Sequence, residues 1–204
     1  MAFIVIEGID GAGGETQTKL LEEYLKSKGK ECVRIESPDM STPVGRAYNE
    51  YLYERFHMSN EAVFLLCGCD VIINKPLIKK AKKEGKIIIA DRYITSTIAY
   101  QSANNFPFEK ALKFVELMEY PRADLIIFMD ISPRTSMERK KREKGMLDKH
   151  EKDVEYLKMV RKFYLEEIKR NVLGRWVMIN GERSVKKIHE EIVKIVNKEL
   201  EIHS

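Results

Sequence analysis

The chain contains no apolar run that approaches the ~18 residues needed to cross a membrane, so we expect no membrane-spanning helix. Its three cysteines are too few, and odd in number, for a disulfide framework. The first residues carry neither the basic segment nor the long apolar stretch of a secretory signal. These absences predict a cytoplasmic protein that has no membrane partner.

The net charge is also small, at +4 from 36 basic and 32 acidic residues, which argues against nucleic acid as a partner. Hydrophobic residues make up 44% of the chain and charged residues 33%, a composition that excludes a disordered chain. A length of 204 residues fits one domain, which we expect to span 1–204. The basic excess lies in 134–152, which has eight basic and four acidic residues. By itself, this excess fits a solvated helix face as well as it fits a functional role.

Short, mostly apolar runs alternate with segments of helical periodicity. They are typical of buried strands and comprise Ala2–Ile6, Cys32–Ile35, Ile87–Ala90, Leu125–Met129 and Trp176–Ile179. Repeated strand–helix–strand units predict an α/β fold, with a parallel sheet covered by helices on both faces. Ligands of such folds bind beyond the carboxyl ends of the strands, so the loops that follow the strands are the candidate site.

The loop after the first strand is rich in glycine. Gly8 and Gly13 have the spacing of a phosphate-binding loop, but Gly14 and Glu15 stand where that pattern has lysine and Ser or Thr. Glycines allow unusual backbone angles, and the following helix N-terminus offers free N–H groups to a phosphate. The alternative is a tight strand–helix connection that binds no ligand.

This loop resembles the opening of the thymidylate kinase family, which usually reads EGIDGAGKTTQ. The match resumes at Thr16-Gln17, so the two differences are substitutions and not a shift in register. A second segment, Asp91–Gln101, is similar to the family signature of Asp-Arg-Tyr, then Ser, then Ala-Tyr-Gln. A carboxylate at a strand end suits a metal, and an adjacent arginine suits a phosphate, although a structural Asp–Arg pair would have the same sequence.

The resemblance extends over most of the chain, from Phe3 to about Ile195. The segment 37–45 resembles the family's second loop, and the basic segment at about 134–152 resembles its mobile lid. The resemblance implies a P-loop NTPase-like three-layer sandwich, with a five-stranded parallel sheet and a helical lid. It also implies small-molecule nucleotides as partners, Mg²⁺ as cofactor and a homodimer.

The implied reaction is transfer of the γ-phosphate of ATP to dTMP, which yields dTDP and ADP. By resemblance, ATP is bound by Gly8, Ile9, Asp10, Gly11, Ala12, Gly13, Gly14, Glu15 and Thr16. The acceptor is bound by Asp10, Cys67, Arg92, Ser96, Tyr100 and Gln101. The metal is held by Thr16 and Asp91, and the catalytic residues are Asp91, Arg92, Arg139 and Arg142.

The sequence departs from the family at several positions expected to contact ligands. Gly14 and Glu15 replace loop residues, and Met40 replaces an arginine. Counted back from Asp91, the aromatic that stacks on thymine and a further arginine are replaced by Cys67 and Val71. Phe64, three residues before Cys67, would share its helix face and is included as a candidate contact to the base.

These losses leave three hypotheses open. The chain is a kinase of the thymidylate kinase type, a non-catalytic or weakly active nucleotide-binding paralogue, or a kinase for another pyrimidine monophosphate. For the kinase, Arg139 and Arg142 of the lid are a candidate source of the missing charge. Removal of one preorganised charge donor typically lowers a rate by roughly 10²–10³-fold. Restoring lysine and threonine to the loop would therefore raise turnover, unless the lid already supplies the charge.

Overall fold

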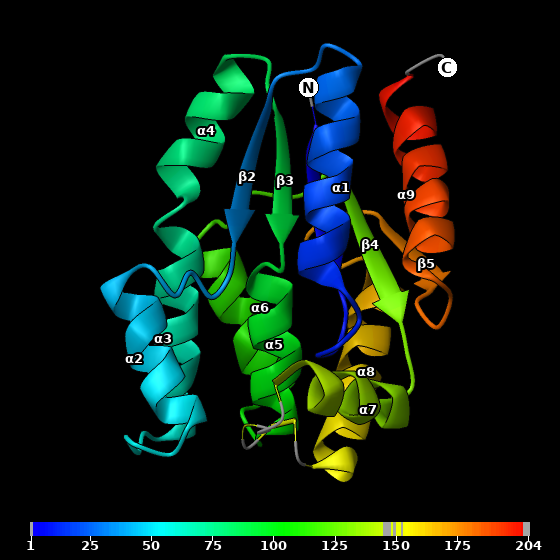
Figure 1. Ribbon diagram of the computed structural model, residues 1–204. Helices are drawn as coiled ribbons and strands as arrows, with labels where there is room; N and C mark the ends of the chain where they lie inside the picture. The colour runs from blue at the N-terminus through cyan, green and yellow to red at the C-terminus, as the bar shows by residue number, and fades with distance from the viewer. Residues whose placement is uncertain (1, 145–147, 149, 152, 202–204) are drawn as a thin grey trace.

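The computed structural model describes residues 2–144, 148, 150–151 and 153–201, without the side chain of Lys144 (Figure 1). Parallel strands form a sheet in the order β2-β3-β1-β4-β5. The strands are β1 (Phe3–Glu7), β2 (Cys32–Glu36), β3 (Ile87–Asp91), β4 (Leu125–Asp130) and β5 (Trp176–Asn180). The predicted α/β fold is confirmed, and each predicted strand agrees with the structure to within one residue at either end.

Helices cover the sheet on both faces (Figure 1). In front of it lie α1 (Gly14–Ser27) and α9 (Val185–Leu200), and behind it α5 (Ile94–Ala103) packs against α8 (Val154–Arg170). The remaining helices are α2 (Pro43–Leu52), α3 (Asn60–Ile72), α4 (Lys75–Lys83), α6 (Phe108–Leu117) and α7 (Pro133–Lys144). None of the described helices is both long and apolar enough to cross a membrane.

The central strands explain why the sheet forms. All five residues of β1 are buried, and so are the first five residues of β4. Continuous apolar strands of this kind are stable only with a helical layer on each face. Side-chain caps begin several helices: the Thr42 side chain accepts a hydrogen bond at the start of α2, and the Ser184 side chain does so at the start of α9.

The register of the sheet brings two loops together. In the parallel pairing of β1 with β3, Ile6 lies opposite Asp91, so the loop after β1 starts beside the residues that follow β3. Neighbouring strands are only about 4.8 Å apart. The carboxyl ends of all five strands point to one edge of the sheet, where α7 lies beyond β4 (Figure 1).

The lid expected at about 134–152 is described only in part. The described residues are those of α7 together with Asp148, His150 and Glu151. Residues 145–147, 149 and 152 lie outside the described residues, and so does any part of the prediction that falls on them.

Candidate functional site

Two adjoining cavities open at the carboxyl edge of the sheet. The large cavity, with a volume of about 750 Å³, is lined by every residue from Gly8 to Thr16 and by Asp91. The small cavity, of about 170 Å³, is lined by Cys67 of α3 and by Ser96, Tyr100 and Gln101 of α5. Six residues line both cavities: Asp10, Ser37, Pro38, Met40, Arg92 and Lys140. Almost all predicted ligand contacts therefore gather at one place.

The loop between β1 and α1 has the backbone of an anion-binding turn. Gly11 and Gly13 adopt left-handed angles, with φ of 77° and 95°, which favour glycine. No side chain caps the start of α1 at Gly14. The first N–H groups of a helix have no partner within the helix, so they are available here to an anion in the large cavity.

The two substituted loop residues behave differently. A β-carbon added at Gly14 would collide with Asp91 Oδ1, so the Asp91 carboxylate occupies the space beside this position. The Glu15 side chain is 66% exposed and pairs with Lys19 Nζ at 2.5 Å, one turn along α1. A hydrogen bond from Lys19 and its positive charge lower the pKa of Glu15. Thr16 is exposed at the wall of the large cavity.

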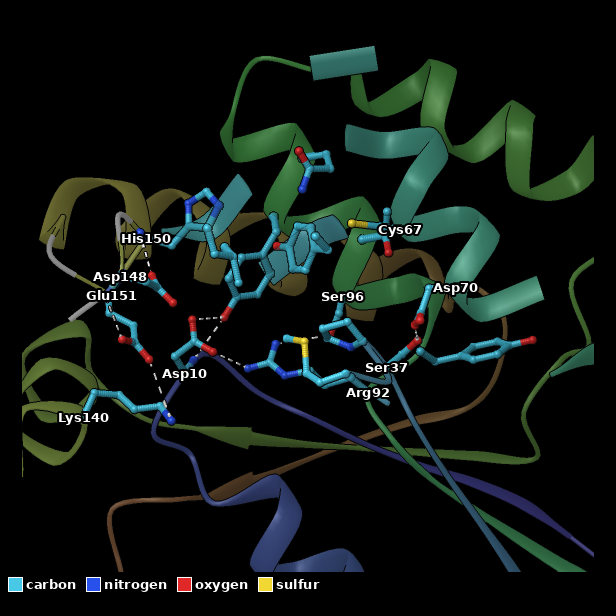
Figure 2. A pocket seen from close by; sticks show the side chains of 18 residues that line it. Asp10, Ser37, Cys67, Asp70, Arg92, Ser96, Lys140, Asp148, His150 and Glu151 are labelled. Atoms are coloured by element: carbon cyan, nitrogen blue, oxygen red, sulfur yellow. Dashed lines mark hydrogen bonds and ion pairs between the residues drawn. The ribbon is translucent and has the colours of Figure 1, made fainter. Parts of the chain in front are cut away.

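Arg92 and Asp10 form an ion pair at the boundary between the two cavities (Figure 2). Arg92 Nη2 donates to Asp10 Oδ1 at 2.7 Å, and the Tyr100 hydroxyl donates to Asp10 Oδ2 at 2.9 Å. The guanidinium of Arg92 also lies 5.2 Å from the centre of the Tyr100 ring. Three predicted site residues from two loops and one helix are thus held in a single group.

Beneath this group lies a carboxylate that sequence reasoning missed. Glu7 ends β1 and is buried; its oxygens accept hydrogen bonds from the backbone N–H groups of Tyr93 and Ser96 and from the hydroxyls of Thr95, Ser96 and Tyr164. Burial raises the pKa of Glu7, and the charge of Arg92 opposes that rise. Glu7 therefore ties β1 to the start of α5. The available signal was a single charged residue at the end of an apolar strand.

Asp70 of α3 has a similar supporting position. Its carboxylate accepts a hydrogen bond from the Ser37 hydroxyl at 2.5 Å and another from the backbone N–H of Asp39 at 3.2 Å. Burial raises the pKa of Asp70, and these hydrogen bonds lower it. The segment 37–45, similar to the family's second loop, is thereby fixed to α3 at the wall of the small cavity.

Gln101, Cys67 and Tyr48 also line the small cavity. The Gln101 side chain is buried, and among the described residues neither its amide nitrogen nor its amide oxygen has a hydrogen-bond partner. A buried amide left without partners is costly, so this group is suited to a polar ligand. Burial raises the pKa of the Cys67 thiol, which is consequently neutral.

The expectation for Phe64 is corrected by the structure. Phe64 does not line the small cavity; its ring stacks on Phe106, with centroids 4.2 Å apart, and meets Phe114 edge-on at 5.1 Å. The side chain turns into the main core because two aromatic rings are available there. Val71 is likewise a core residue.

The two lid arginines are placed differently. Arg139 donates to the backbone carbonyls of Gly11 at 3.1 Å and Gly181 at 3.0 Å, and it lines the large cavity. Arg142 is exposed and lines neither cavity. The structure therefore does not bring Arg142 to the site. Lys140, which sequence reasoning missed, lines both cavities instead.

Asp91 stands among other acidic groups in the wall of the large cavity. Its pKa is raised to about 6: burial is the largest cause, the charge of Arg92 opposes the rise, and the charges of Glu7, Glu36 and Glu15 add to it. No group of three or more His, Cys, Asp or Glu side chains in the described part of the chain could hold a metal ion. Any metal here needs ligands in addition to protein side chains.

Known proteins are similar in sequence to this chain along almost its whole length. The family model described as thymidylate kinase matches residues 6–192. The thymidylate kinase of Fervidobacterium nodosum is 33% identical over 200 residues, which cover 96% of this chain and 98% of that protein. A probable thymidylate kinase of Thermococcus onnurineus is 38% identical over 211 residues, with 97% and 98% covered. One from Pyrococcus abyssi is 33% identical, with 97% of each chain covered. The extent of these matches, over the residues that build both cavities, shows that the chain belongs to the thymidylate kinase family.

Proposed function

We propose that this protein transfers the γ-phosphate of ATP to dTMP, forming dTDP and ADP. The observation that carries the proposal is the pair of adjoining cavities with Arg92 and Asp10 at their boundary. Phosphoryl transfer requires that two phosphates be held in line and that their charge be neutralised, with little covalent chemistry by the protein. Residues 1–204 form one kinase domain, with a lid at about 134–152.

ATP binds in the large cavity. Its phosphates lie on Gly8–Thr16, where the left-handed glycines and the uncapped start of α1 supply N–H donors. Arg139 holds the lid against this loop through the Gly11 carbonyl. The volume of about 750 Å³ is within the range of small-molecule sites.

Mg²⁺ is the proposed cofactor, and the residues present fit it. Mg²⁺ is usually bound by one or two carboxylates together with substrate phosphates and water, so a single half-buried carboxylate such as Asp91 is sufficient. Asp91 and the Thr16 hydroxyl would hold the ion at the wall of the large cavity. When bound, the ion neutralises negative charge on the phosphates.

The acceptor binds in the small cavity. The guanidinium of Arg92 binds the phosphate of dTMP, because its fork of donors matches phosphate oxygens. The unpartnered amide of Gln101 binds the base, and Cys67 forms part of the apolar wall around it. A cavity of about 170 Å³ is small and therefore suits a single pyrimidine ring.

The alternatives raised by the sequence are not favoured. A non-catalytic paralogue would not be expected to keep the full arrangement of Asp10, Arg92 and Tyr100. Family membership over residues 6–192 also favours the dTMP kinase.

We also propose a homodimer. Helix α3 is apolar on nearly every side, yet Leu65, Cys69 and Ile73 at its outer side are exposed. Leu117 and Met118 are exposed as well, on the segment that contacts α3 through Gly68. A helix that is apolar all round is normally buried, so a second copy covering this face accounts for the pattern. A cytoplasmic location fits the three free cysteines.

The activity is tested by incubating the protein with ATP, Mg²⁺ and one monophosphate at a time, with the products separated by ion-exchange chromatography. We expect dTDP and ADP from dTMP, and at least tenfold less product from dCMP, dUMP or AMP. No ADP above a protein-free blank would refute the kinase, and a preference for dCMP would refute dTMP as the substrate.

The dimer is tested by light scattering. The natural protein should give twice the monomer mass, and the variant Leu65→Glu/Ile73→Glu should give the mass of a monomer.

A further inference from the structure

We propose that Lys140 of α7 supplies the positive charge at the phosphate-transfer point that a phosphate-binding loop usually takes from its own lysine. The inference rests on the proposed function, since the charge acts on the phosphoryl group that passes from ATP to the acceptor. Lys140 is then a catalytic residue that contacts this group, in addition to Arg92.

The boundary between the cavities is where the two phosphates must meet. Of the six residues that line both cavities, only Arg92 and Lys140 are cationic. They come from opposite sides, one from the loop after β3 and the other from the lid (Figure 2). Arg92 is already neutralised in part by Asp10 at 2.7 Å, which leaves Lys140 as the second source of positive charge.

The loop itself provides no cation at this point. At position 14, where the phosphate-binding pattern has lysine, the chain has glycine, and the space beside it is occupied by the Asp91 carboxylate. The large cavity is also lined by Glu7, Glu15 and Glu36. These carboxylates place negative charge beside the phosphates of a nucleotide, so a cationic side chain from outside the loop would favour their binding in addition to the metal ion.

Lys140 is positioned to exchange its present partners for a phosphate. Its side chain is 15% exposed, and its ammonium lies 3.0 Å from Glu143 Oε2 and 3.8 Å from Glu151 Oε1. Glu143 is 58% exposed, so its carboxylate is free to turn into water when a phosphate takes its place. The positive charge of Lys140 also contributes to the lowered pKa of Glu15, which places its field at the start of α1.

Other basic residues near the large cavity have different tasks. Both terminal nitrogens of Arg139 are bonded to backbone carbonyls, those of Gly11 and Gly181. Arg183 forms an ion pair with Glu191 on α9. Arg142 is exposed and lines neither cavity. The role considered for Arg139 and Arg142 from the sequence is therefore assigned to the lysine between them.

The step is balanced without any further reactant. A phosphate oxygen of dTMP forms a bond to the γ-phosphorus of ATP, and the bond from that phosphorus to the β–γ bridging oxygen breaks. The electron pair leaves with ADP. Lys140 remains protonated throughout and stabilises the negative charge on the oxygens of the transferring group.

The test compares Lys140→Ala with Lys141→Ala, the neighbouring lysine on the exposed side of α7. We expect kcat for dTDP formation to fall about 100-fold in Lys140→Ala, with KM for dTMP changed less than about threefold. Lys141→Ala should remain within twofold of the natural protein. Added methylammonium or ethylammonium should raise the rate of Lys140→Ala at least tenfold and should not raise the rate of Lys141→Ala. A merely structural lysine would not show this rescue.

Two further measurements make the outcomes distinct. Thermal melting of each variant, followed by circular dichroism, identifies a folding defect. If Lys140→Ala fails to fold, Lys140→Met replaces it, because methionine keeps most of the apolar length of the lysine side chain. If the natural protein forms dTDP and Lys140→Met does so within threefold of its rate, Lys140 is not the charge donor although the kinase stands. If the natural protein forms no dTDP, the proposed function itself fails and the role of Lys140 with it.

Discussion

The small and the large cavity share a boundary but are built by different means. In the wall of the small cavity, Tyr93 and Ser96 are held by hydrogen bonds to Glu7, and Asp10 is held from two sides by Arg92 and Tyr100. The large cavity, of about 750 Å³ against about 170 Å³, is walled mainly by a glycine-rich backbone and by carboxylates.

This difference shows where the protein has kept its fixed charges and where it has lost one. On the acceptor side, a guanidinium is positioned by its own scaffold before any ligand binds. On the ATP side, the loop offers backbone N–H groups, and the proposed positive charge comes from Lys140 of α7. We therefore expect substitutions on the two sides to affect different kinetic constants.

The largest effect is expected for Arg92→Ala. KM for dTMP should rise at least about 100-fold while KM for ATP changes less than about threefold, because the dTMP phosphate loses the guanidinium that binds it. Arg92→Lys should recover only part of the loss, since an ammonium lacks the fork of donors. Initial rates over a grid of both substrates measure this, with exposed Arg55→Ala as control. Equal weakening of both substrates would contradict the assignment.

Gln101→Leu should have the next largest effect. Removing the amide deprives the base of hydrogen bonds, so KM for dTMP should increase about 10- to 30-fold with kcat nearly unchanged. Isothermal titration with dTMP measures the dissociation constant directly, and this constant should increase by the same factor as KM. Unchanged affinity would mean that the buried amide faces no ligand.

Restoring the loop sharpens the comparison further. In the Lys140→Ala background, Gly14→Lys with Glu15→Thr should raise kcat at least about tenfold, whereas in the natural background it should gain less than threefold. The new lysine requires the Asp91 carboxylate to rotate, because that group fills the space beside position 14. The same gain in both backgrounds, measured by single-turnover rates, would show that α7 supplies no charge.

The smallest catalytic effect, and the clearest stability effect, is expected for Glu167 of α8. This carboxylate is buried and, in the described part of the chain, has no hydrogen-bond partner; burial and then the charge of Glu7 raise its pKa. A carboxyl with a raised pKa lowers stability progressively as the pH rises above its ordinary value. Glu167→Met should thus raise the unfolding free energy by about 1–3 kcal/mol at pH 8, and by less at pH 5.

Urea melts at the two pH values measure this difference. The neighbouring Glu166→Gln, which removes a surface ion pair with Arg170, is the control and should change stability by less than about 1 kcal/mol. A loss of stability in Glu167→Met at pH 8 would mean that the carboxylate has a partner in solution.

The sequence predicted the five strands because each is an apolar run between clear helical patterns, and it predicted Asp10, Arg92, Tyr100 and Gln101 because they lie in motifs. It missed Glu7, Asp70 and Lys140, whose roles depend on which groups the fold brings near them. It was wrong about Phe64: spacing gives the helix face of a residue, but the rings of Phe106 and Phe114, distant in sequence, decide where the side chain packs.

Arg92 has a left-handed backbone, with φ of 65°, a conformation that penalises every residue with a β-carbon. Arg92→Gly and Arg92→Ala remove the same guanidinium, and the left-handed penalty applies only to alanine, so the glycine variant should be about 1 kcal/mol more stable, as urea melts would reveal. The protein thus retains at this position a residue that its backbone disfavours. A search for thermostable variants that scored stability alone would prefer glycine over alanine here and would discard the proposed acceptor-binding group in either case.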